Sequence, residues 1–472
     1  MAKKFTRREF LKSATLVAAG GVLAACTSQA TPTAAPAQQT EVPGVVNPTA
    51  TPAAPQGKNL SYWFAWGATY AGQAWPAMLK LPEYSEIMGN TTLEIKSSVP
   101  EENLLTAVAG GSPPDCAGNV NYLDYMARGV VTPVDEYVAA SKRIKKEDFY
   151  DANWQLGMWK GKLYGIPCTE GFVRYGTDYN KQMVTDAGLD PTKPPETWDE
   201  WLEWHKTLTV FDEAKNIKHI GLDPLDAMGE SLWTTDGWLW QVSWAADDWF
   251  DPNTGKFNIA NDKMLDYFDT VKKFTDIIGM DNLSGLHSVQ GQGTWGGSFN
   301  TWVQAIIIEG YWHPGETVNE QPEHTPPNMA TWAPVPTSRK GTKIQLAGGH
   351  TIISFKDGVN KNPEGAYLIQ EFVNTKAALD VTYNTTGWLP GLKSYIETVD
   401  PSKFPGLDFY IKSAKEATEW HSPLPCPITS FVANTFVEVR EKVLRDQMTG
   451  KEAAADLQKR VEDEYKAAGF TS

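Results

Sequence analysis

The sequence predicts an α/β protein with two domains. Short strand-like runs alternate with amphipathic helical patterns, which is the order of elements expected in an α/β fold. Residues 58–472, about 415 residues, follow a polar spacer. A chain of this length usually folds into more than one domain, each with its own hydrophobic core. After the N-terminal leader, no apolar run reaches the roughly 20 residues that a membrane-spanning helix needs. We therefore expect two packed domains outside any bilayer.

Residues 1–25 are predicted to be an export signal. A basic segment precedes a short apolar run at residues 16–25, which is the order of a cleavable signal peptide. The stretch TRREFLK at residues 6–12 resembles the twin-arginine export motif, and ordinary Sec export is the alternative. The stretch LAAC at residues 23–26 resembles a lipobox. Cys26 is therefore the predicted lipidation site, with an ordinary thiol as the alternative.

The segment after Cys26 is predicted to be a disordered tether. Residues 27–57 are almost all Thr, Ala, Pro, Gln, Gly and Val, a composition that builds no core and favours extended, semi-rigid conformations. Residues 26–57 thus form a lipidated cysteine and its spacer. We expect the mature protein at the extracytoplasmic face of the cell membrane, attached by the lipid anchor only.

The charge of the chain bears on its partners. Removing the leader's five basic residues and one acid changes the formal charge from −15 to −19. Such a chain is a poor ligand for nucleic acid, because affinity for phosphates depends on Lys and Arg. We expect no nucleic-acid partner and a monomeric protein.

Three cysteines remain beyond Cys26, namely Cys116, Cys168 and Cys426. An odd number cannot be fully paired within one chain. Two arrangements fit the sequence: a disulfide between Cys168 and Cys426, or three buried thiols. Their spacing does not match a metal site, and no cofactor motif is present.

The first domain begins with a series of alternating elements. Apolar alternation predicts strands at residues 60–66, 92–97 and 116–120. Helical periodicity predicts helices at residues 75–88, 101–109 and 122–128. Pro113 and Pro114 stop any helix before the third strand.

Helices are also predicted further along the chain. Thr197, with Glu200 three positions later, forms a capping box at a helix start. Amphipathic helices are expected at residues 264–278, 363–374, 431–448 and 451–467. The last two are separated by Thr449-Gly450.

The aromatic content indicates the kind of ligand. The chain has 19 Trp, 17 Tyr and 18 Phe, and several Trp residues stand beside Gly or polar residues rather than in aliphatic runs. A ring beside Gly leaves room for a flat ligand, and the C–H faces of sugars stack on electron-rich indoles. The alternative for each Trp is core packing. As a group, they favour carbohydrate contact.

Several motifs resemble one known family in the order that the family has them. They are LTAVAGGSPPD (105–115), GVVTPVDEY (129–137), WKGKLYGIP (159–167), Tyr179-Asn180-Lys181 with Ala187-Gly188-Leu189, TWDE (197–200), Phe299…Ala305…Gly310…Trp312, APVP (333–336), Gly348-Gly349 and TGWLP (386–390). Together they resemble the family 1 extracellular solute-binding proteins of ABC importers, which include the maltose-binding protein. The resemblance spans about residues 60–465. It departs at Trp302, where the family usually has a small residue.

The resemblance implies a two-lobe periplasmic-binding-protein fold with a multi-strand hinge and a ligand cleft between the lobes. It implies that lobe one is 58–168 with 346–392, and that lobe two is 169–345 with 393–472. The chain would cross between them near Pro167, near Leu346 and just after Pro390. The implied function is capture of a carbohydrate, an oligosaccharide, outside the cytoplasmic membrane and its delivery to the membrane permease of an ABC importer.

Candidate ligand contacts lie at strand ends and motif loops that would face this cleft. Trp312 of the Gly-x-Trp motif is the best stacking platform, and Glu170 and Asn119 offer hydrogen-bonding groups for hydroxyls. The full set of predicted ligand-binding residues is Trp66, Asn119, Glu170, Trp240, Trp312, Gly349, His350 and Trp388.

Two alternatives to sugar transport remain. The same transport role can serve a polyamine, a polyol or a glycerol phosphodiester. A secreted carbohydrate-active enzyme is the other alternative, but no carboxylate pair is singled out, and the sequence has no Gly-x-Ser-x-Gly motif, no metal-ligand cluster and no P-loop. We therefore expect a binding protein and not an enzyme.

Overall fold

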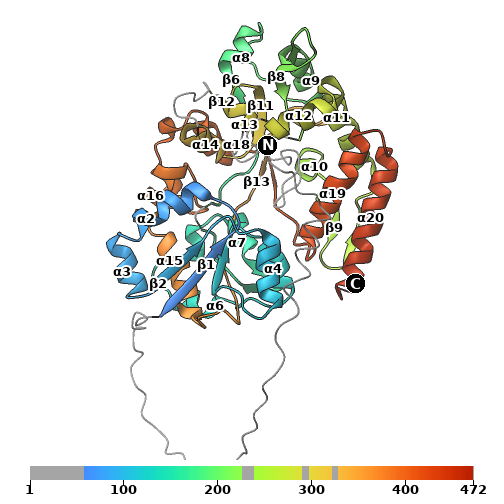
Figure 1. The fold of residues 1–472 in the computed structure, drawn as a ribbon. Helices are drawn as coiled ribbons and strands as arrows, with labels where there is room; N and C mark the ends of the chain where they lie inside the picture. Colours follow the sequence, from blue (N-terminus) through green and yellow to red (C-terminus); the bar gives the residue numbers. More distant parts are fainter. Residues whose placement is uncertain (1–57, 169, 226–238, 290–296, 321–327, 471–472) are drawn as a thin grey trace, which may run out of the picture. The chain divides into compact units, whose positions relative to one another are not determined.

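The computed structural model describes residues 58–168, 170–225, 239–289, 297–320 and 328–470, all within one compact unit, Ala54–Ser472. The predicted signal peptide, Cys26 and the tether lie outside these ranges. Among the described helices, none has the length and apolar character needed to cross a membrane. Two central sheets with separate hydrophobic cores divide the described chain into two lobes (Figure 1).

The sheet of lobe one has the strand order β14-β3-β1-β2. Strand β1 (Asn59–Phe64) is parallel to β2 (Thr92–Lys96) and to β3 (Cys116–Gly118), and β14 (Ile353–Ser354) is antiparallel to β3. Lobe one therefore takes in a segment more than 200 residues downstream of its first strands, as the resemblance implies.

Helices pack on this sheet, and α15 contacts α3 closely (Figure 1). The other elements of lobe one are η1 (Tyr70–Ala74), α2 (Trp75–Met78), α3 (Pro82–Met88), α4 (Glu101–Ala109), α5 (Tyr122–Ala127), α6 (Asp135–Ala140), η2 (Lys146–Asp148), α7 (Asp151–Leu156), β4 (Met158–Trp159), β5 (Lys162–Leu163), α15 (Pro363–Val373), α16 (Lys376–Thr386), α17 (Lys393–Ile396) and η4 (Pro401–Lys403).

The sheet of lobe two has the strand order β12-β6-β11-β8-β7. All six residues of its central strand β11 (Gln304–Glu309) are buried, because strands on both sides and helices on the faces cover it. The other elements are β6 (Gly176–Asn180), α8 (Lys181–Asp186), α9 (Trp198–Leu208), β7 (Val210–Phe211), β8 (Ile217–Leu222), α10 (Leu239–Ser243), β9 (Phe250–Asp251), β10 (Lys256–Phe257), α11 (Asp262–Ile278), α12 (Met280–Val289), α13 (Gly297–Asn300), α14 (His313–Glu320), β12 (Asn328–Thr331), η3 (Thr337–Arg339), α18 (Leu407–Glu416), α19 (Thr429–Leu444) and α20 (Gly450–Ala467).

Three stretches of chain run side by side where the lobes join, and we call them the joining strands: residues 167–168 with 170–174, 347–351 and 389–392. Bridges pair Pro167 with Thr351 and Val173 with Ala347. The Gly171 amide donates to the Leu389 carbonyl at 2.9 Å. Nearby, β13 (Ile344–Leu346) is parallel to β15 (Glu419–His421). The joining strands lie where the three crossings are expected.

Some element boundaries differ from the prediction. The single helix expected at residues 75–88 is two helices, because Pro82 starts α3 and the preceding Leu81 is extended. Strand β1 ends at Phe64, so Trp66 lies in the following loop. The exact lobe boundaries stay predictions, although Tyr395 and Ile396, assigned to lobe two, pack in the core of lobe one.

The three described cysteines are buried thiols, and no disulfide joins Cys168 to Cys426. Cys168 packs in the core of lobe one, whereas Cys426 packs in that of lobe two. The disulfide arrangement is therefore wrong, because the two residues belong to different cores.

Candidate functional site

Three predicted residues meet at the joining strands, and we call Trp66, His350 and Trp388 the aromatic cluster. The half-buried ring of Trp66 makes edge-on contacts with His350 at 5.0 Å and with Trp388 at 5.6 Å between ring centroids. Such edge-to-face pairs are a favoured aromatic geometry. The loop after β1, one joining strand and the residue that directly precedes another joining strand bring these rings into contact, although they are far apart in sequence.

The loop that carries Trp66 depends on Gly67. Its φ is +104°, and a Cβ there would lie 3.0 Å from the Trp388 ring. The Asn119 side chain donates from Nδ2 to the Trp66 carbonyl at 3.2 Å. Asn119 is itself in the left-handed region at φ 53°. Asn119 thus holds the loop, a positioning role that its amide performs in addition to any contact with ligand.

A buried charge pair lies beside the aromatic cluster. Arg174 Nη2 donates to Glu170 Oε2 at 2.7 Å, and both side chains are almost fully buried. His350 Nε2 lies 3.6 Å from the same carboxylate oxygen. The second oxygen, Glu170 Oε1, is buried and has no hydrogen-bond partner among the described residues. Because buried acceptors are normally hydrogen-bonded, this oxygen is a candidate to accept a hydrogen bond from a ligand.

Glycine permits the joining strands to approach so closely. Gly349 has φ +135°, and a Cβ on it would lie 2.4 Å from Gly171 Cα. The His350 amide donates to the Glu170 carbonyl at 2.9 Å across the same contact. Gly349 therefore acts through its backbone, by setting His350 against Glu170.

Trp312, which follows strand β11 of lobe two and packs in the hydrophobic core of lobe one, contacts the charge pair. The guanidinium carbon of Arg174 lies 5.1 Å from the centre of the Trp312 ring, within range of a cation–π contact. Trp312 Nε1 donates to Glu309 Oε2 at 2.8 Å, and the residue is 7% exposed. Beside it, burial and then the negative charge of Glu170 raise the pKa of Tyr311.

The structure does not bring Trp240 to this place. Trp240 is fully buried on α10, in the core of lobe two. Arg174 is the residue that the sequence reasoning missed. Its position four residues after Glu170 was the available signal, since it gives the carboxylate a cation on the same joining strand.

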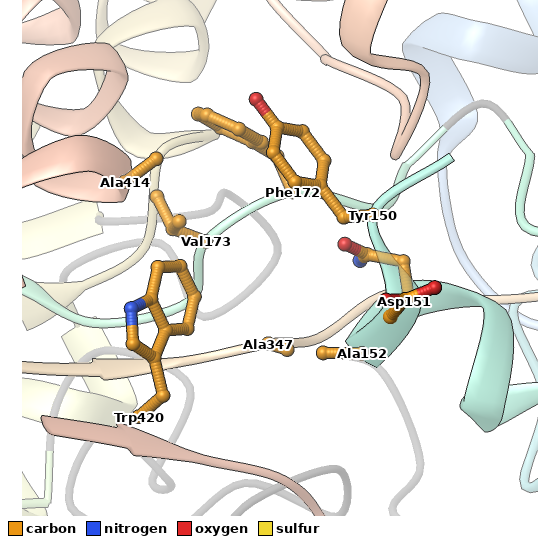
Figure 2. A pocket seen from close by; sticks show the side chains of 9 residues that line it. Tyr150, Asp151, Ala152, Phe172, Val173, Ala347, Ala414 and Trp420 are labelled. Atoms are coloured by element: carbon orange, nitrogen blue, oxygen red, sulfur yellow. The ribbon is translucent and has the colours of Figure 1, made fainter. Parts of the chain in front are cut away.

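A separate pocket lies on the joining strands, and we call it the joining-strand pocket (Figure 2). Its volume is about 210 Å³, and it is partly open to solvent. Figure 2 shows the Tyr150 and Phe172 rings at one end and the Trp420 indole at the other, with Val173 and Ala347 between them. Its lining is nearly all apolar, so it offers little to a polar ligand.

The described residues contain no cluster of three His, Cys, Asp or Glu side chains that could hold a metal ion. What the site offers is stacking surface and hydrogen-bonding groups, where two lobes meet. Such junctions are preferred places for ligand binding.

The fold belongs to the class of two-lobe periplasmic binding proteins. A structure of CpMnBP1 with mannotriose bound superposes with a TM-score of 0.72 at 20% identity, covering 85% of this chain and 99% of that one. A solute-binding protein of Thermotoga lettingae bound to α-D-tagatose has a TM-score of 0.71 at 17% identity, covering 86% and 99%. The MalE domain of Bdellovibrio bacteriovorus bound to maltotriose has a TM-score of 0.64 at 17% identity, covering 86% and 100%.

The chain belongs to the family described as bacterial extracellular solute-binding protein, which matches residues 66–378. No curated protein sequence matches it significantly. Members of this family are binding proteins, and the chain is accordingly a solute-binding protein of an ABC transporter.

Proposed function

We propose that this protein captures a carbohydrate, an oligosaccharide, outside the cytoplasmic membrane and delivers it to the permease subunits of an ABC importer. The observation that carries the proposal is the meeting of Trp66, His350 and Trp388 with the Glu170–Arg174 pair at the joining strands. Aromatic faces accept the C–H surfaces of sugar rings, and charged groups bind hydroxyls with stronger hydrogen bonds than neutral groups do.

The individual roles follow from the geometry. Glu170 Oε1 accepts a sugar hydroxyl, because this buried oxygen has no other donor in the described part of the chain. Trp66 is the most accessible ring of the aromatic cluster and stacks on a sugar face. Trp312 packs against the Arg174 guanidinium and thereby helps to hold the Glu170–Arg174 pair in place. Structures with a similar fold were solved with mannotriose, tagatose and maltotriose bound, which supports a saccharide as the ligand.

The charges at the site weigh against the other solutes. A polyamine needs uncompensated negative charge, whereas Arg174 already neutralises Glu170. A phosphate needs an available cation, whereas Arg174 already binds Glu170 and packs on Trp312. A neutral ligand with many hydroxyls suits the Glu170–Arg174 pair, whose charges cancel, better than a polyamine or a phosphate does.

The location is part of the proposal. We infer that Cys26 carries a lipid, that residues 26–57 tether a monomer at the extracytoplasmic face, and that the leader is of the twin-arginine type, as the motifs at residues 6–12 and 23–26 favour. A tether raises the concentration of the receptor near its permease without a permanent contact. Membrane fractionation of the full-length protein tests the anchor.

A ligand screen tests the function. The mature protein is mixed with mono- to hexasaccharides of several linkages, polyols, polyamines and glycerol phosphodiesters, and the melting temperature is followed. A ligand that binds only the folded state raises the melting temperature. At a ligand concentration of 100 times Kd, the free energy of unfolding increases by about 2.7 kcal/mol. We expect a shift with an oligosaccharide, confirmed by calorimetry. A shift with a polyamine or a phosphodiester and with no sugar contradicts the proposal.

A further inference from the structure

A second pocket has no lining residue in common with the aromatic cluster, and we call it the hairpin pocket. Its volume is about 400 Å³, and it is partly open to solvent. One wall is the β4–β5 hairpin, with Trp159 and Lys160, whose strands pack with lobe one. The opposite wall comes from the β9–β10 hairpin and the end of α20, which pack with lobe two (Figure 1).

Four aromatic residues line this pocket, whose exposed surface is mainly polar. Trp159, Tyr465 and Phe470 are partly exposed, and the buried Phe250 also lines the pocket. Tyr465 contacts Phe250 at 5.8 Å and Phe470 at 5.4 Å between ring centroids, so the tyrosine is held in place by its neighbours. Partly exposed, fixed rings present flat surfaces at a low cost in conformational entropy.

Polar groups stand around the same rings. Asn253 and Thr254 lie in the β9–β10 turn, which Asp251 fixes by accepting from the Asn253 amide at 2.9 Å and from the Thr254 hydroxyl at 2.6 Å. Gly255, at φ +65°, leaves space for the Tyr465 hydroxyl, which would lie 2.7 Å from a Cβ there. Lys160 adds an exposed ammonium group from the other lobe. The combination of flat rings and hydroxyl-binding groups is one that sugars require.

We propose that the hairpin pocket is a second saccharide subsite, which takes the distal rings of a long oligosaccharide. The inference rests on the proposed function and deepens it, because it assigns a ligand of several rings rather than a mono- or disaccharide. Its volume lies within the range of small-molecule sites, about 300–1,000 Å³. Since its walls come from both lobes, a ring bound there contacts both and stabilises their contact.

Chain-length dependence tests the subsite. Calorimetry measures the affinity of the wild-type protein for di- to hexasaccharides of the linkage that binds. We expect the affinity to rise at least tenfold over this series, about 1.4 kcal/mol. Trp159→Ala is expected to remove this gain and to leave the affinity for the shortest ligand within twofold.

Two further variants separate the subsite from a packing effect. Asn253→Trp fills the pocket mouth from an exposed position and removes no packed side chain, so it is expected to abolish the gain with an unchanged melting temperature. Trp420→Ala removes an exposed indole from the joining-strand pocket and is expected to keep the gain.

The outcomes are distinct. A wild-type affinity that does not change with length overturns the subsite and leaves sugar binding intact. A gain that survives in both Trp159→Ala and Asn253→Trp overturns it as well. Failure of every saccharide to bind overturns the subsite together with the proposed function.

Discussion

At the scale of residues, one chain of contacts connects the predicted ligand-binding side chains. Trp312 packs on Arg174, Arg174 pairs with Glu170, and Glu170 faces His350 of the aromatic cluster. Removing one partner of a buried ion pair costs about 3–5 kcal/mol, because the other charge is left uncompensated. Each member is therefore tied to both stability and binding.

Trp312→Ala is expected to weaken oligosaccharide binding by more than tenfold. The indole holds the Arg174 guanidinium from one side, and its loss allows the charge pair to move away from the ligand. Stability should also fall by about 3–5 kcal/mol, because Trp312 is almost fully buried. Calorimetry on the folded variant measures the first effect and denaturant titration the second.

Trp332→Ala is the matched control, since that half-buried indole also packs under a cation, with Lys343 Nζ 5.4 Å from its ring. Its affinity should stay at the wild-type value. Unchanged affinity in Trp312→Ala itself would remove Trp312 from the binding site.

At the scale of elements, two helix starts follow a local sequence rule. The capping box predicted at Thr197 and Glu200 is confirmed, and a second one joins Thr449 to Glu452 at the start of α20. In each, the Thr side chain accepts from a backbone amide of the first turn, and the Glu side chain accepts from the Thr amide. The four residues of each capping box therefore determine where the helix begins.

Thr449→Ala is expected to lower the free energy of unfolding by about 1 kcal/mol, because the α20 amides lose their side-chain acceptor. Denaturant titration measures this, and ligand affinity should not change. Thr207→Ala is the control: its hydroxyl bonds to a carbonyl inside α9, where no amide depends on it. An equal loss in both variants would show that the cap contributes nothing of its own.

At the scale of the whole molecule, lobe one touches the start of α19 in lobe two. Asn121 Nδ2 donates to Ser430 Oγ at 2.8 Å. Asp124, on the adjacent turn of α5, is buried, and burial raises its pKa to about 7, although Ser430 and Arg128 lower it in part. Glu101 and Cys426 also face this carboxyl group. The contact therefore includes a titratable group.

The contribution of Asp124 to the free energy of unfolding is expected to fall as the pH rises from about 4 to about 7, whereas His205 and His313, whose pKa values burial lowers, act in the opposite sense. The folded protein holds the Asp124 proton more tightly than the unfolded chain does, because the pKa of this carboxyl group is higher in the folded state. The resulting stabilisation is complete below the pKa of the unfolded state and is lost as the pH rises through the pKa of the folded state. Burial also raises the pKa of Asp178 to about 7, so this residue acts in the same sense.

Asp124→Asn is expected to flatten this dependence and to be more stable than wild type at pH 8, because no charge is then buried. Melting temperatures measured from pH 4 to pH 8 provide the test, with the exposed Asp186→Asn as control. Parallel curves for Asp124→Asn and wild type would contradict the assignment.

The sequence by itself determined the fold class, the family and most of the helices. Periodicity and caps act within a few residues, and the family motifs occur in order along the chain. The sequence also placed Trp66, Glu170, Trp312, His350 and Trp388 among the residues that the structure then connects by contacts. These features follow from local sequence and from spacing.

Only the tertiary structure decided which of these side chains meet. Trp240 has the same composition around it as other candidates, yet it is buried in the core of lobe two. Cys168 and Cys426 lie in different cores, which excludes their disulfide. The contact of Arg174 with Trp312, and the two walls of the hairpin pocket, depend on segments that are distant in sequence. Long-range packing fixes such contacts, and no local pattern encodes it.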